Sequence, residues 1–228
     1  MSRRKIILAC FTWVLCLVHS ISSQEIVTAS VFFDSLSESY RTIEDYQATL
    51  LILQEESVTM GTLFHKRPNF LLIEFEDPAD QVIAVDGEKL IIYIPFLNVA
   101  LEQQLQKADE NIATLATAPG LDLMKSRYSV AYQDSQDLVP LEEESEELVW
   151  KLVLEWQSID EGFRQLILSV NEDLLIRRIV GVTSSFEEIQ LDFLDILLNQ
   201  GLPEGKFRYE SPSSANVIKD FIFEPEEE

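Results

Sequence analysis

Apolar and polar residues alternate with two different periods along this chain. Between 27 and 43 the apolar residues recur every three or four positions, which predicts an amphipathic helix. Its apolar members are Val31, Phe32, Leu36, Tyr40 and Ile43. Beyond this helix most segments alternate with a period of two, as half-buried β-strands do. The clearest of these is 148–156, where Leu148, Trp150, Leu152, Leu154 and Trp156 share one face.

The strands predicted by this alternation follow one another with short polar turns between them. They are 46–54, 58–66, 71–76, 81–85, 89–94, 96–105, 148–156, 163–170, 174–183, 186–197 and 217–223. Asp86-Gly87 is a strong hairpin signal. A second helix is expected over 107–117, ended by Ala118-Pro119-Gly120, with a further helical turn open at 121–124. No βαβ alternation is visible, so we expect an antiparallel meander.

The strand after Pro68 has two different faces. Leu71, Ile73 and Phe75 lie on one face, and the other carries Leu72, Glu74 and Glu76. The glutamates indicate that the second face meets solvent, so the first should face an interior. By the same parity Arg67 points inward, unless Pro68 forces a bulge. A guanidinium there needs backbone carbonyls or an acid; the alternative is a simple ion pair with one of the 40 acidic residues.

The first residues have the pattern of a secretory signal peptide. Arg3, Arg4 and Lys5 precede an apolar run over 6–18, and small residues follow at 20–23. The apolar run is shorter than the roughly 20 residues of a membrane span. We therefore expect cleavage after Ser22 or Ser23 and one domain over 24–228, with an uncleaved anchor as the alternative.

Cleavage would change what chemistry the chain can perform. It removes Cys10, Cys16 and His19, so the mature chain has no cysteine and keeps only His65. This excludes thiol catalysis and disulfides, and it argues against a zinc site or a Ser-His-Asp site. The formal net charge would pass from −23 to −26 with the loss of three basic residues. Such a charge argues against nucleic acid and anionic lipid surfaces as partners.

An acidic run occupies 142–147, where five of six residues are glutamate. A solvated loop or hairpin tip explains it most simply. The alternative is a docking surface for a basic partner.

Three motifs in order resemble the LolA family of periplasmic lipoprotein carriers. The first is Gly61 to Pro68, which ends in Lys66-Arg67-Pro68. The second is Val85 to Pro95, with its Asp86-Gly87 turn. The third is the closing Phe221-Ile222-Phe223-Glu224-Pro225. Each is weak alone, but their order on an exported β-rich chain is specific, and the likeness extends over essentially the whole mature chain.

The resemblance implies a mainly β fold with helices: an incomplete antiparallel β-barrel around an apolar cavity, covered by lid helices. It implies that the cavity receives lipoprotein acyl chains and that Arg67 holds the lid of the empty form closed. A bulky residue that is often Phe in the family maps onto Leu71, with Phe70 beside it. The residues expected to line the cavity are Phe32, Leu36, Leu63, Phe70, Leu71, Ile73, Phe75, Ile112 and Trp150.

The resemblance also implies a cellular location and binding partners. A monomeric periplasmic chaperone would take lipoproteins from an inner-membrane ABC-type releasing complex to an outer-membrane acceptor, without a cofactor or metal. The alternative is a lipid- or lipoprotein-sensing module with a regulatory partner, as in RseB-like relatives. Enzymatic use of carboxylate pairs such as Glu74 and Glu76 is the weakest hypothesis, since ordinary charged strand positions explain them.

Overall fold

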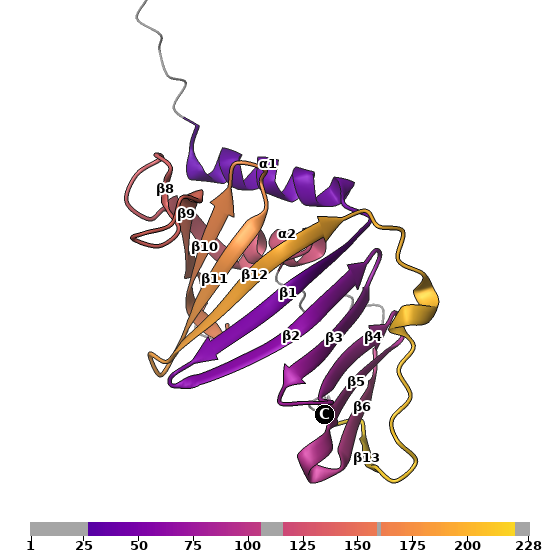
Figure 1. Cartoon of the computed structure of the whole chain (residues 1–228). Helices are drawn as coiled ribbons and strands as arrows, with labels where there is room; N and C mark the ends of the chain where they lie inside the picture. Colours follow the sequence, from indigo (N-terminus) through magenta and orange to yellow (C-terminus); the bar gives the residue numbers. More distant parts are fainter. Residues whose placement is uncertain (1–26, 106–115, 159–160, 222–228) are drawn as a thin grey trace, which may run out of the picture.

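The computed structural model describes residues 27–105, 116–158 and 161–221 (Figure 1). The leader (1–23), Ile112 and the end of the third motif lie outside these residues. Within the described ranges, thirteen strands form one curled sheet, in the order β13-β6-β5-β4-β3-β2-β1-β12-β11-β10-β9-β7, with β8 beside β9. Every neighbouring pair is antiparallel except β13 and β6. The expected open β-barrel with helices is therefore confirmed.

The first half of the sheet continues from strand to strand along the chain. Its elements are α1 (Ala29–Thr42), β1 (Asp45–Gln54), β2 (Ser57–Lys66), β3 (Phe70–Asp77), β4 (Val82–Asp86), β5 (Lys89–Ile94), η1 (Pro95–Leu97) and β6 (Val99–Gln104). At the β4–β5 hairpin, the Asp86 carboxylate accepts the backbone N–H of Lys89 at 2.8 Å, and Gly87 has φ +93°. An Asp-Gly pair supplies that turn because glycine tolerates positive φ.

The second half starts with a helix and closes back on β1. Its elements are α2 (Ala118–Arg127), β7 (Tyr128–Tyr132), β8 (Val139–Pro140), β9 (Leu148–Trp156), β10 (Phe163–Asn171), β11 (Ile176–Thr183), β12 (Glu188–Leu198), η3 (Glu204–Phe207) and β13 (Asn216–Lys219). Because β12 pairs with β1, two segments far apart in sequence form the middle of the sheet. The interval 107–117 falls mostly outside the described residues.

One expected helix boundary and one expected strand pairing were wrong. Ala118-Pro119-Gly120 opens α2 instead of ending a helix, because proline fits the first turn, where its missing N–H costs nothing, and the Thr117 hydroxyl caps Gly120 N–H. The last strand was expected to extend the meander from 217. Its described part, β13, instead crosses to β6 and pairs parallel with it.

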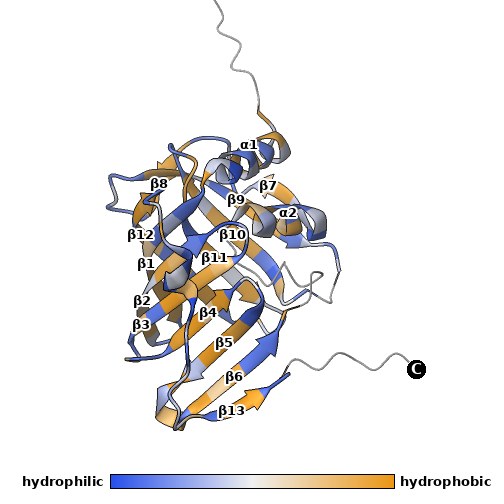
Figure 2. Cartoon of the chain, turned by 90° about the vertical axis from the view of Figure 1, so that its right-hand side faces the viewer, coloured by the Kyte–Doolittle hydropathy of each residue, from blue (hydrophilic) through white to orange (hydrophobic). Residues whose placement is uncertain are grey.

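The main core lies inside the curl. Phe33 and Leu36 of α1 are fully buried there with Leu121 of α2, against inward residues of the strands. Of the apolar residues expected in the first helix, Val31 faces solvent (54% exposed), and Phe33 is buried in its place. Figure 2 shows α1 and α2 side by side across one end of the curved sheet. We call α1 and α2 the lid helices.

A second, smaller core lies on the outer face of the sheet. Phe207 of η3 is fully buried against Phe64, Leu72 and Tyr93 among others. The expectation that the Leu72 face of β3 meets solvent was therefore wrong at Leu72, although Glu74 and Glu76 are exposed. Residues 199–215, which we call the outer segment, cover this part of the sheet. The segment begins where the Asp45 carboxylate accepts the backbone N–H groups of Gln200, Gly201 and Leu202.

Candidate functional site

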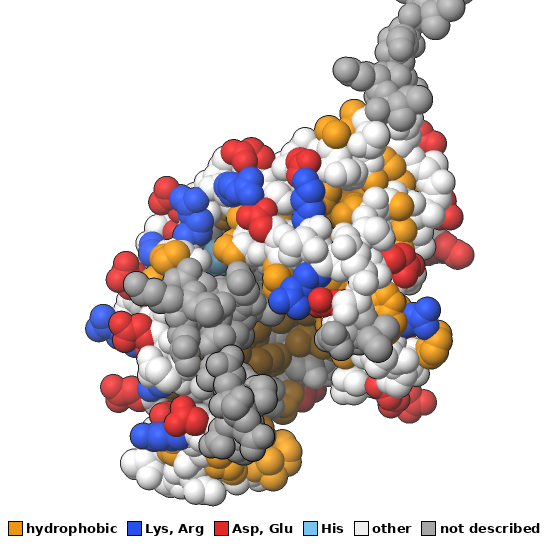
Figure 3. Space-filling view, turned by 180° about the vertical axis from the view of Figure 1, so that it is seen from behind, with side chains coloured by type: hydrophobic (Ala, Val, Ile, Leu, Met, Phe, Trp, Pro, Cys, Tyr) orange, Lys and Arg blue, Asp and Glu red, His pale blue; other side chains and the backbone are white. Residues whose placement is uncertain are grey.

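An apolar cavity of about 110 Å³ lies within the curl. Strands β1 to β4 and β12 supply its wall, because their inward positions are apolar at every second residue. Its lining residues are Tyr46, Leu50, Ile52, Leu63, Leu71, Ile73, Phe75, Ile83, Ala116, Leu191 and Phe193. From behind, the surface is hollowed and apolar side chains are visible in the hollow (Figure 3). A space lined in this way accepts hydrocarbon and offers almost nothing to a polar ligand.

The one polar side chain that the described residues place in the lining is already satisfied. The Tyr46 hydroxyl donates to the backbone carbonyl of Ala116 at 3.0 Å, and burial raises the pKa of this phenol well above its usual value. The cavity wall is thus hydrogen-bonded to the residue two positions before α2. Tyr46 was not anticipated from the sequence, although its alternation with Ala48, Leu50 and Ile52 in β1 could have indicated it.

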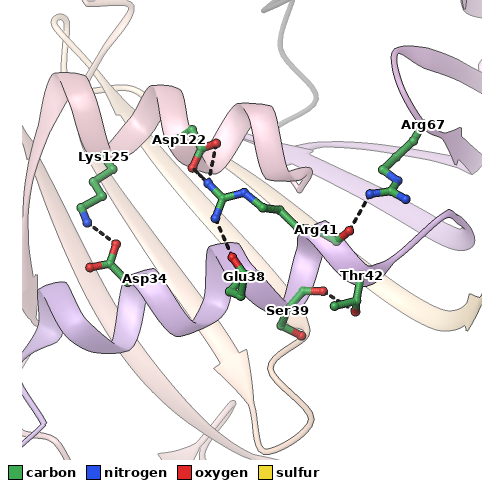
Figure 4. A network of polar contacts seen from close by, with 8 residues as sticks. All are labelled: Asp34, Glu38, Ser39, Arg41, Thr42, Arg67, Asp122 and Lys125. Carbon is green, nitrogen blue, oxygen red and sulfur yellow. Dashed lines mark hydrogen bonds and ion pairs between the residues drawn. The ribbon is translucent and has the colours of Figure 1, made fainter.

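Ion pairs join the two lid helices (Figure 4). Asp122 of α2 accepts two hydrogen bonds from the Arg41 guanidinium at 2.7 and 2.8 Å, and Lys125 of α2 pairs with Asp34 of α1. Arg41 also pairs with Glu38 within α1 at 2.8 Å. All these side chains are 40% exposed or more, so water screens their attraction and each pair is weak.

Arg67 holds the end of α1 from the other side. Its guanidinium donates to the backbone carbonyl of Arg41 at 2.5 Å and lies 3.7 Å from the Glu44 carboxylate. The carbonyl is in the last turn of α1, where helix carbonyls lack intrahelical partners. The parity of the strand suggests that Arg67 points into the apolar interior, but in the structure it does not. It sits in the turn after β2 with its side chain 44% exposed, because the strand ends at Lys66.

His65 is buried next to this contact. Its ring lies 5.2 Å from that of Tyr46, and its Nδ1 has no hydrogen-bond partner among the described residues. Burial lowers the pKa of His65 to about 4, and the nearby charge of Arg67 acts in the same direction. The imidazole is therefore neutral at pH 7 and contributes no charge to the interior.

Ile112 lies outside the described residues, and the other residues expected to line the cavity divide into three groups. Leu63, Leu71, Ile73 and Phe75 lie in its wall. Phe32 and Leu36 are buried on the inner face of α1, and Trp150 packs against Phe32 with 4.9 Å between ring centroids.

Phe70 lies elsewhere. Its ring is 5.5 Å from that of Phe207 in the outer core, since neighbours in a strand face opposite sides. This placement corrects the expectation that Phe70 lines the cavity.

Other chemistry has little support in the described residues. No group of three or more His, Cys, Asp or Glu side chains gathers there in a way that could hold a metal ion. No helix of the described residues is long and apolar enough to cross a membrane.

The sequence matches a known family over most of its length. The pattern of the family described as "Outer membrane lipoprotein carrier protein LolA" matches residues 53–210. An outer-membrane lipoprotein carrier protein of Hahella chejuensis is 26% identical over 213 residues, which is 89% of this chain and 95% of that protein. The protein of the same name from Pseudomonas putida strain KT2440 is 24% identical over 162 residues, 71% of this chain and 72% of that one.

Solved structures share the fold at low identity. An uncharacterized conserved protein from Thermus thermophilus superposes with a TM-score of 0.55 at 15% identity, over 83% of this chain and 98% of its own. MucB superposes with a TM-score of 0.52 at 15% identity, and the aligned part spans 65% of the MucB chain. These likenesses concern the fold alone. The family match over 53–210, which covers more than half of the chain, leads to one conclusion: the chain belongs to the LolA family.

Proposed function

We propose that this protein is a periplasmic chaperone that binds lipoprotein acyl chains in its apolar cavity and carries lipoproteins from the inner to the outer membrane. The observation that supports it best is the cavity itself. Its lining, as far as the structure describes the chain, offers hydrocarbon contacts and a single polar side chain, that of Tyr46, which is already hydrogen-bonded. The relatives named as outer-membrane lipoprotein carriers support the same function. We assign the protein no catalytic role, cofactor or metal.

The size of the cavity requires the lid helices to move. A space of about 110 Å³ holds the end of one acyl chain, not several whole chains. Burying an acyl chain is worth about 0.8 kcal/mol per methylene group. A fully enclosed lipid would therefore leave very slowly unless closure of the empty protein competed with it.

Arg67 is our candidate for the latch of that closure. Its hydrogen bond to the Arg41 carbonyl joins the β2–β3 turn to the end of α1. One charge-assisted bond of this kind is worth about 1–3 kcal/mol, less where water reaches it. That is enough to favour the closed form and small enough for a ligand to overcome.

The proposed location and partners follow from the leader and the family. Cleavage after Ser22 or Ser23 would release a monomeric protein with a single domain over 24–228 into the periplasm. It would receive lipoproteins from an inner-membrane ABC-type complex and deliver them to an outer-membrane acceptor. N-terminal sequencing of the exported protein tests the first step: a chain that starts at Met1 or Ser2 would contradict it.

Co-production with a mature lipoprotein tests the carrier function. We expect a soluble complex that native mass spectrometry resolves as one protein with one acylated lipoprotein. The matched control is the same lipoprotein with its acylated cysteine replaced, which should not bind. Failure with several different lipoproteins would contradict the proposal.

The alternative is a lipid- or lipoprotein-sensing module with a regulatory partner. The fold likeness to MucB favours it, and MucB occurs with MucA in one solved complex of Pseudomonas aeruginosa. Transfer separates the two functions: a carrier passes its lipoprotein to acceptor membranes or an acceptor protein, whereas a sensor retains it.

A further inference from the structure

A second pocket, separate from the acyl cavity, opens beside the first turn of α1. It measures about 330 Å³ and has an aromatic floor made by Phe32, Tyr132 and Trp150. The Phe32 ring is 4.9 Å from that of Trp150 and 6.1 Å from that of Tyr132. Leu138 adds an apolar wall, and the carboxylate of Asp137 stands at the rim. We call this the aromatic pocket.

The loops around the aromatic pocket carry excess negative charge. Residues 133–147, which include β8, contain no Lys or Arg. Glu142 and Glu147 pair with Arg178 and Arg177 of β11 at 2.6 and 2.7 Å. Five further carboxylates in this stretch are exposed and have no ion pair within the described part of the chain: Asp134, Asp137, Glu143, Glu144 and Glu146. Of these five, Asp137 lines the aromatic pocket itself, and the others belong to the same acidic stretch of chain. An apolar floor next to such a stretch fits a cationic ligand that has an apolar anchor.

The aromatic pocket is built partly from the lid. Phe32 belongs to α1, and the Tyr132 hydroxyl donates to the backbone carbonyl of Val27, just before α1, at 3.1 Å. The start of α1 is therefore attached through the same side chains that form the pocket floor. A ligand that inserts between Phe32 and Leu138 competes with these contacts.

We propose that the aromatic pocket docks a basic polypeptide segment through one aromatic or aliphatic anchor residue, and that its occupation loosens the first turns of α1. The docking goes beyond the carrier function, and only the effect on the lid rests on that function. The partner thus acts on the end of α1 opposite to the one that Arg67 holds.

A second acidic pocket provides a matched control. It lies at the far end of the sheet, at the β1–β2 and β11–β12 turns, where Glu55, Glu187 and Glu188 surround Phe186 (Figure 1). The Arg164 guanidinium already covers the Phe186 ring, 4.2 Å from its centroid. This pocket has charge without an available aromatic floor, so we do not expect it to hold the same ligand.

Calorimetric titration with short blocked peptides tests the docking. The probes are Lys-Lys-Phe-Lys-Lys, Lys-Lys-Gly-Lys-Lys and Glu-Glu-Phe-Glu-Glu. We expect saturable binding of the first, binding about fivefold or more weaker for the second because the anchor is lost, and none for the third. Asp137→Asn and Leu138→Ser should each weaken binding about fivefold, whereas Glu187→Gln and Phe186→Ser should leave it within about twofold. Circular dichroism checks that each variant is folded.

Three results would overturn the docking: no saturable binding of Lys-Lys-Phe-Lys-Lys, equal binding of the glycine peptide, or loss of binding in the far-end variants instead of the aromatic-pocket variants. The lid part has its own measurement, the rate at which a dansylated fatty acid enters the protein. We expect the bound phenylalanine peptide to raise this rate about threefold in the wild type and not in Leu138→Ser. An unchanged rate refutes the lid part. If the fatty acid never enters, the carrier function fails while the titration still decides the docking.

Discussion

At the scale of single residues, Arg41 and Arg67 make two different contacts at the lid helices. The Arg41 guanidinium pairs with Asp122 of α2, while its backbone carbonyl accepts the hydrogen bond from Arg67. A side chain can be replaced without removing the carbonyl, so the two contacts can be tested separately. Arginine suits the Arg67 position because its guanidinium reaches both the carbonyl and Glu44.

Replacing Arg67 tests the latch. We expect Arg67→Leu to leave the protein folded, because the packing of β2 does not use the guanidinium. The closed form of the empty protein should lose about 1 kcal/mol of free energy relative to the open form, so bound lipoprotein should be released roughly five times more slowly. The measurement is the rate of transfer from the carrier to acceptor membranes. Arg164→Leu removes a guanidinium at the far end of the sheet and is the control; transfer at the wild-type rate by Arg67→Leu would contradict the latch.

His65 gives a prediction about pH. Its pKa is about 4 in the folded protein, below the usual 6.5, because burial disfavours the charged imidazole. The unfolded chain therefore binds more protons between these values, and stability is lost as the pH falls from 6.5 towards 4. Between pH 7 and pH 4 the protonation of His65 should lower the free energy of unfolding by about 3 kcal/mol, and His65→Phe should abolish this contribution. Urea unfolding of both proteins at several pH values measures it, and parallel pH profiles would show that His65 contributes nothing.

At the scale of elements, the lid helices are joined to each other by surface charges and packed on the core by apolar faces. The ion pairs set how α1 and α2 lie relative to each other, and Phe33, Leu36 and Leu121 supply the burial. Exposed pairs are weak and screened by salt, so the joint between the helices can open at little cost. The opening and closing of the cavity that we propose would need such a joint.

Reversing a charge tests this joint. Asp122→Lys places a cation against Arg41, so we expect the dansylated fatty acid to enter about two to five times faster. The double variant Arg41→Glu with Asp122→Lys restores the pair and should return the rate towards the wild type. Arg127→Met, which breaks a pair with Glu161 away from α1, is the control. A double variant as fast as Asp122→Lys alone would mean that the pair does not restrain the lid.

At the scale of the whole molecule, apolar cores lie on both sides of the sheet. The inner one surrounds the cavity, and the outer one lies under the outer segment. Strands β3 to β5 are therefore packed on both faces. In the function that we propose, their outer face would stay fixed while the inner face exchanges contact with the lid for contact with ligand. The outer segment is in turn anchored at Asp45, one residue before Tyr46 of the cavity wall.

Phe207→Ala tests the outer core. Phe207 is fully buried, so we expect a loss of about 3–5 kcal/mol in the free energy of unfolding. Because Phe207 does not reach the cavity, acyl binding by the folded fraction should be unchanged. Urea unfolding measures the loss. The control is Phe186→Ala, which should change the free energy of unfolding by almost nothing because the Phe186 side chain is 70% exposed. A loss below about 1 kcal/mol would show that the outer segment packs only loosely.

Structural features that depend on residues only a few positions apart could be predicted from the sequence alone. Alternation with a period of two placed Leu71, Ile73 and Phe75 on the inner face of β3, and the Asp86-Gly87 pair located the β4–β5 hairpin. The helical spacing of Phe32 and Leu36 located α1. Each of these follows from side chains a few residues apart, which the geometry of one helix or strand fixes directly.

Which surfaces meet could be learned only from the folded chain. Arg41 and Asp122 are 81 positions apart in the chain, and Asp45 and Gly201 are 156 apart. The sequence predicted Phe70 in the cavity and Leu72 at the solvent face. Because the outer segment covers this part of the sheet, both residues pack in the outer core instead. The end of β2 at Lys66 directed Arg67 to α1 instead of the interior. Such contacts depend on how the whole sheet curls and closes, and no periodicity within one segment carries that information.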